Sequence, residues 1–153
     1  MKYLKPSLDH VSEMLGMLYD GDVDPIEVKD VGDAAYVATF VNPEGEVVAA
    51  CLSDAGMTIF SGAALSMLPP GGAKDMVSDK EFTKSVLDNF YEVMNICSRL
   101  LMSNSTPHLK LAELIPMSTA AAQSLGSLSN AVSICYELGI PKYGKGRVQF
   151  LVS

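Results

Sequence analysis

A chain of 153 residues has the usual size of a single domain, and we predict one domain over residues 1–153. Apolar residues make up 48% of the chain and charged residues 19%, which is typical of a globular protein. The formal charge of −7 comes without a basic stripe, which argues against nucleic acid as a partner. No apolar run has the length of a membrane span or the form of a signal peptide, so we expect a cytoplasmic protein that does not bind membranes.

The cysteines and histidines form no disulfide or metal-binding pattern. Cys51, Cys97 and Cys135 are odd in number, far apart and each embedded in an apolar segment. His10 and His108 have no cysteine or histidine at ligand spacing. We therefore predict three buried thiols, no bound metal and no cofactor of the protein's own.

The first third of the chain predicts a helix followed by a hairpin. Ser7 suits a helix N-cap, and Asp20-Gly21 suits a helix end, so a helix is expected over 8–20. The sequence Asn42-Pro43-Glu44-Gly45 has the chemistry of a type I turn between two strands. The strands expected in this region, from residue composition, are 25–30, 34–41 and 46–52.

Two further helices are predicted in the middle of the chain. Apolar residues at helical spacing indicate a helix within 53–68, which ends at a Pro69-Pro70-Gly71-Gly72 loop that lacks the pattern of a phosphate-binding loop. Ser78-Asp79-Lys80-Glu81 has the pattern of a capping box, which predicts the start of a long helix that ends near Met102.

The last third favours strands. The expected elements are a strand over 108–115, a short helix or loop over 120–128, a strand over 131–138, a turn at 143–146 and a strand over 147–152. Because the turns between neighbouring strands are short, we predict an α+β fold with a largely antiparallel sheet and long helices packed on one face.

The chemically pointed residues lie on the long helix. This helix has an apolar stripe, formed by Phe82, Val86, Phe90, Val93, Cys97, Leu100 and Leu101. At 100° per residue, Asp88, Glu92, Asn95 and Arg99 fall within one narrow sector opposite this stripe. Such a sector is most often the solvated side of an amphipathic helix, and spacing alone does not give it a function.

The pattern Asp88-x3-Glu92-x2-Asn95, followed about twenty residues later by Pro116 at the end of a strand, resembles the signature of the chemotaxis phosphatases CheX, CheC and FliY. The order of the expected elements is most similar to that of CheX. A related pattern in the first helix, Asp9-x3-Glu13-x2-Gly16, has a glycine in place of the amide, so at most one site is expected.

The resemblance implies hydrolysis of the aspartyl phosphate on a CheY-type receiver domain, with Glu92 and Asn95 as the catalytic pair. It also implies that Asp88, Glu92, Met94 and Arg99 contact the partner, that the receiver supplies the Mg²⁺, and that the chain is a homodimer paired through its sheet, for which the segment 131–138 offers an edge.

A departure from the family pattern at Met94 favours a second hypothesis. Met94 stands between the acid and the amide, where the family usually has a small residue, and no glycine follows Asn95 closely. Bulk at Met94 is expected to hinder docking. The alternative is therefore a binding module that docks on a receiver or another partner and hydrolyses nothing.

Overall fold

The structure is a computed structural model that describes residues 3–118, 125, 128 and 131–153. Six strands form one sheet in the order β1-β5-β6-β3-β2-β4, and every neighbouring pair is antiparallel. The predicted α+β fold with an antiparallel sheet is confirmed. The strands are β1 (Ile26–Val28), β2 (Ala34–Val41), β3 (Val47–Asp54), β4 (Lys110–Pro116), β5 (Val132–Ile140) and β6 (Gly144–Val152).

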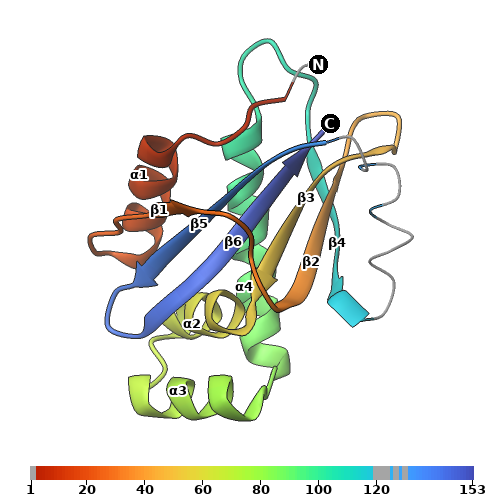
Figure 1. Cartoon of the computed structure of the whole chain (residues 1–153). Helices are drawn as coiled ribbons and strands as arrows, with labels where there is room; N and C mark the ends of the chain where they lie inside the picture. The colour runs from red at the N-terminus through yellow and green to blue at the C-terminus, as the bar shows by residue number, and fades with distance from the viewer. Residues whose placement is uncertain (1–2, 119–124, 126–127, 129–130) are drawn as a thin grey trace.

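The described helices are four α-helices and one 3-10 helix. In Figure 1, α4 runs behind the sheet, and α3 lies at the end of the molecule opposite both chain termini. Their bounds are α1 (Leu8–Tyr19), α2 (Ala55–Ser66), α3 (Pro70–Asp79), α4 (Lys84–Cys97) and the 3-10 helix Ser98–Leu101. None of them combines the length and the apolar character that a membrane span requires, within the part of the chain that the structure describes.

The main core lies between the sheet and three helices. It joins residues of α1, α2 and α4 to the side chains on one face of the strands, among them Ala38 and Phe40 of β2. Val37, which points to the other face of β2, belongs to a second and smaller cluster with Ala50, Leu52 and Cys135. This split follows from the two-residue period of a strand. The helices α1, α2 and α4 therefore pack on one face of the sheet, as predicted.

The N-terminal helix and the first hairpin form as their local signals predict. The side chain of Ser7 accepts a hydrogen bond from the backbone N–H of His10, and Asp20 ends α1 in the left-handed conformation. In the hairpin, the Gly45 N–H donates to the Asn42 carbonyl, and the Asn42 side chain accepts from the backbone of Glu44 and Glu46. These contacts are all local, which is why they could be predicted from the sequence.

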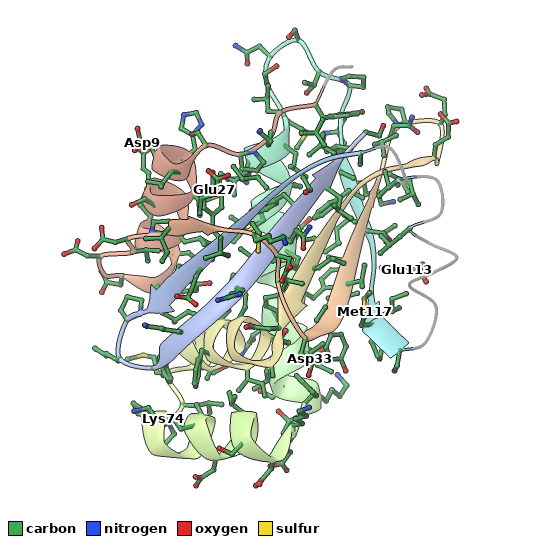
Figure 2. The ribbon with its side chains drawn as sticks, viewed as in Figure 1. Asp9, Glu27, Asp33, Lys74, Glu113 and Met117 are labelled. Atoms are coloured by element: carbon green, nitrogen blue, oxygen red, sulfur yellow. The ribbon has the colours of Figure 1, made fainter. Side chains whose placement is uncertain are left out.

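The prediction for residues 69–83 is wrong. Pro70 opens α3 instead of standing in a loop, because a proline at the first helical position loses no backbone hydrogen bond. Lys74 lies on this helix (Figure 2). The predicted capping box at Ser78 does not form, since α3 continues to Asp79 and Lys80 caps its C-terminus. Thr83 is the true N-cap of the next helix, and its side chain accepts from the Val86 N–H.

Two smaller differences concern the C-terminal third. The turn predicted at 143–146 lies instead at 141–143, because β5 and β6 pair as far as Ile140 and Gly144. The predicted helix or loop over 120–128 lies outside the described residues except at 125 and 128. The strand predicted over 108–115 is observed as β4, displaced by one or two residues.

Candidate functional site on helix α4

Packing against α2 holds α4 in place. The Asn89 side chain donates a hydrogen bond to the Gly62 carbonyl at 3.0 Å and a second one to Ser66. Gly62 allows the two backbones to approach closely, because a Cβ atom there would lie 2.4 Å from the Val86 carbonyl oxygen. These contacts fix α4 against α2 and so hold the exposed face of α4 in place.

The acid and the amide both lie on the exposed side of α4. Glu92 and Asn95 are exposed, whereas Val93 and Met94 between them are buried. Residues three apart on a helix have Cβ atoms roughly 5–6 Å from each other, so the carboxylate and the carboxamide can reach one small group together. Neither side chain makes a hydrogen bond or ion pair with the described residues. Both are therefore available to a partner.

Asn95 stands in the last turn of α4. Its backbone carbonyl accepts from the Ser98 N–H, and from the Ser98 hydroxyl at 2.7 Å, where the chain tightens into the 3-10 helix. Arg99 follows on that 3-10 helix and is exposed. The predicted sector of Asp88, Glu92, Asn95 and Arg99 is thus exposed throughout.

The remaining members of the sector differ in their surroundings. The Asp88 carboxylate accepts a hydrogen bond from the Lys84 ammonium at 2.7 Å. The two residues are four positions apart on the helix, and both side chains are exposed. Arg99 and Glu92 take part in none of the ion pairs found in the described part of the chain. A partner that contacts Asp88 has to compete with Lys84, although an exposed pair of this kind contributes little to stability.

Met94 is wrong as a partner-contact residue. Its side chain is fully buried, at 0% exposed, and belongs to the main core. The reason is helical spacing, because Met94 lies four residues after the buried Phe90 and seven before the buried Leu101. The bulk that was expected to hinder docking therefore points away from the exposed face.

Pro116 lies far from the acid and amide. It ends β4 opposite Tyr36, and it lines a shallow pocket with Asp33, Lys80 and Phe82, close to where α4 begins. Asn95 is three turns further along α4, roughly 16 Å at 5.4 Å per turn. Figure 2 labels Asp33 at the start of β2 and Met117 just after β4. The proline of the sequence pattern therefore forms no part of the surface around Asn95.

Tyr91 is the residue that the sequence reasoning missed. It is 38% exposed and lies one turn before Asn95, on the same side of α4. The signal was present in the sequence, since Tyr91 is four residues from Asn95 and three from Asp88. The neighbouring Phe90, in contrast, is buried as part of the apolar stripe.

The chemistry available elsewhere is limited. Cys51, Cys97 and Cys135 are free and buried, as predicted. Burial raises the pKa of Cys97 to about 12 and that of Cys135 to about 11, so neither thiol is a nucleophile at neutral pH. The described residues contain no group of three or more His, Cys, Asp or Glu side chains that could hold a metal ion.

Comparisons with known proteins establish the fold. No family model and no curated protein matches the chain. Among solved structures, a chain of the FliM–SpeE complex from H. pylori matches with a TM-score of 0.65 at 10% identity, over 95% of this chain and 80% of that one. The FliM middle domain from H. pylori matches with a TM-score of 0.57 at 8% identity, over 95% of this chain and 84% of that one.

The chain has the fold of the FliM middle domain. The matches also include the CheX–CheY–BeF3–Mg²⁺ complex from Borrelia burgdorferi, with a TM-score of 0.44 at 12% identity, over 95% of this chain and 94% of that one. FliM, CheX and CheC-like proteins all occur among the structural matches. At these identities, the FliM-type fold is what the comparisons establish.

Proposed function

We propose that this chain hydrolyses the aspartyl phosphate of a CheY-type receiver domain, and that Glu92 and Asn95 carry out this function. The observation that carries the proposal is the orientation of three side chains within one turn of α4. Glu92 and Asn95 are exposed within one turn of α4, whereas Met94 is wholly buried. The side chain that counted against docking on sequence grounds therefore does not obstruct a receiver.

The reaction suits a bare acid and amide. A water oxygen attacks the phosphorus, the bond from phosphorus to the aspartyl oxygen breaks, and the products are inorganic phosphate and the free aspartate. Most of the catalytic task is to position the water and to compensate charge. The carboxamide of Asn95 has both a donor and an acceptor, so it can hold the water in line with the phosphorus.

Glu92 has a different role in the proposal. Its exposed carboxylate would pair with a lysine of the receiver and so anchor the docked complex through a charge-assisted hydrogen bond. The receiver would bring the Mg²⁺ that neutralises the phosphate. Because the receiver would supply the Mg²⁺ and Asn95 would orient the water, the reaction needs no cysteine nucleophile. This fits the raised pKa values of Cys97 and Cys135, which leave these thiols unreactive at neutral pH.

A second candidate is a binding module without hydrolytic activity. The observation in its favour is that two matches with TM-scores above 0.5 are FliM structures, one of them from a complex of FliM with SpeE. In this alternative the exposed face of α4 docks on a receiver or another signalling protein, and Asn95 contributes to contact only.

The experiment measures phosphate release from a receiver of the same organism, charged with acetyl phosphate, with and without this protein. We expect wild type to accelerate release. We expect Asn95→Ala to abolish the acceleration and to leave receiver binding nearly intact, because the amide acts chiefly on the bond-breaking step. Glu92→Ala should weaken both binding and rate, and the binding of wild type should fade with salt.

Asp75→Ala is the matched control, since it removes an exposed carboxylate on α3, outside the α4 site. It should change the rate little. Equal rates for wild type and Asn95→Ala across a panel of receivers would contradict the catalytic proposal. If both proteins nevertheless bind a receiver, the binding module takes its place.

A further inference from the structure

We infer that Tyr91 belongs to the α4 site, the exposed surface of α4 around Glu92 and Asn95, and that it is a docking residue. Its ring contacts an apolar patch of the receiver, beside the contacts that Glu92 and Asn95 make. This inference rests on the proposed function, because it takes the receiver as the partner. It adds a residue that belongs to neither the acid–amide pair nor the charged sector. The expected role is to determine affinity, not the rate of the chemical step.

Exposure sets Tyr91 apart from the other large hydrophobic residues of α4. Seven large hydrophobic residues are exposed in the described part of the chain, and Tyr91 alone among them lies on α4. The other six lie on α1, on β1, on β5 or in connecting segments: Leu4, Leu8, Met17, Ile26, Met67 and Val132.

Four of the other five tyrosines make hydrogen bonds or ring contacts within the fold. The Tyr19 hydroxyl forms a hydrogen bond with the Ser61 hydroxyl. The Tyr136 hydroxyl donates to the Pro6 carbonyl, and the Tyr143 hydroxyl donates to the Leu68 carbonyl. The ring of Tyr36 packs edge-on against Phe82. Tyr91 has neither a hydrogen bond nor a ring contact with any residue that the structure describes. Its hydroxyl and much of its ring are therefore free to meet a partner.

The position of Tyr91 relative to the acid and amide ties it to the same partner. It follows Asp88 by three residues and precedes Asn95 by four, so its ring lies beside the surface that a partner of these two residues contacts. Tyrosine loses little conformational freedom on binding and offers a large apolar area with a polar tip. These properties make tyrosine one of the residues that most often dominate the affinity of an interface.

The charges around Tyr91 favour a receiver as the occupant. Asp88 and Glu92 lie on the same face, and Glu92 has no ion pair with a described residue, so the surface offers an uncompensated carboxylate beside an aromatic ring. The complementary surface has a lysine next to an apolar patch. In the proposed function the receiver supplies that lysine, which pairs with Glu92.

The test compares wild type with Tyr91→Ala and Tyr91→Phe. Binding to a beryllofluoride-charged receiver is measured by titration, and steady-state phosphate release is measured over a range of receiver concentrations. We expect Tyr91→Ala to raise the Kd and the KM about tenfold or more and to leave kcat within about twofold of wild type. Tyr91→Phe should retain most of the affinity, because the ring supplies most of the buried area.

Leu8→Ala is the matched control, because Leu8 is an exposed apolar residue of α1, 43% exposed, that lies outside the α4 site. It should leave both Kd and KM unchanged. Thermal melts should place all three variants close to wild type, since exposed side chains contribute little to stability.

The outcomes separate this inference from the proposed function. A Tyr91→Ala protein that binds and turns over like wild type would overturn the role of Tyr91 and leave the phosphatase proposal standing. If Asn95→Ala releases phosphate like wild type while Tyr91→Ala still binds tenfold more weakly, catalysis fails and the docking residue stands. A wild-type protein that binds no charged receiver overturns both.

Discussion

The three thiols show how burial controls reactivity at single residues. Cys51, Cys97 and Cys135 are each at most 2% exposed. Burial disfavours the charged thiolate and raises all three pKa values, to about 12 for Cys97 and about 11 for Cys135. The thiolate is the reactive species, so at neutral pH almost none of it is present.

We therefore expect the folded protein to be inert toward a thiol reagent at pH 8. All three cysteines should react once the chain is unfolded in guanidinium chloride. Counting modified thiols by mass spectrometry, before and after unfolding, checks this expectation. Rapid modification of any cysteine in the native protein would show that the core around that thiol opens readily.

At the scale of helices and strands, the contact between α2 and α4 determines where the candidate site lies. A Cβ atom on Gly62 would lie 2.4 Å from the Val86 carbonyl oxygen and 2.9 Å from a Val86 methyl group. We expect Gly62→Ala to destabilise the fold by about 1–3 kcal/mol, the usual cost of overpacking. Because α4 has to move away, phosphate release should fall as well.

Gly71→Ala on α3 is the control for this prediction. A Cβ atom there meets nothing within 4 Å, so the alanine should be neutral or stabilise the helix, by up to about 1 kcal/mol. Urea unfolding of both variants measures the two changes. If Gly62→Ala were as stable as wild type, the close approach of the two helices would not be needed to hold α4.

At the scale of the whole molecule, the terminal strands of the sheet differ from the expected one. The segment 131–138 was predicted to offer a dimer edge, but β5 lies inside the sheet, between β1 and β6. The prediction of a β5 edge is wrong, because pairing of β1 with Cys135, Tyr136 and Glu137 cannot be inferred from local composition. The terminal strands are β1, with three residues, and β4, with seven.

Dimerisation itself stays a prediction, now assigned to β4. In Figure 2, Glu113 is labelled on this strand, at the margin of the sheet. An edge of seven residues can pair with the same edge of a second copy about a two-fold axis. Light scattering across a dilution series should report twice the chain mass of 16.3 kDa. A constant mass of 16.3 kDa at every concentration would rule the dimer out.

Much of the candidate site could be predicted because helical periodicity is a local property. The spacing of Asp88, Glu92, Asn95 and Arg99 was enough to place them on one exposed face. The same periodicity also places Met94 on the buried side of α4 and Tyr91 on its exposed side, as the structure shows. The start of α4 was misplaced because two capping signals compete there, and a local pattern cannot decide between Ser78 and Thr83.

The sequence by itself determined the fold class, the first hairpin, the cap of α1 and the chemistry of the exposed face of α4, since each depends on residues within a few positions of one another. The tertiary structure alone decided the strand order β1-β5-β6-β3-β2-β4 and the distance between Pro116 and Asn95. Strand order depends on which apolar faces pack together across the chain. The hydrogen bond from the Tyr136 hydroxyl to the Pro6 carbonyl, between residues 130 positions apart, is another long-range contact that no short-range pattern encodes.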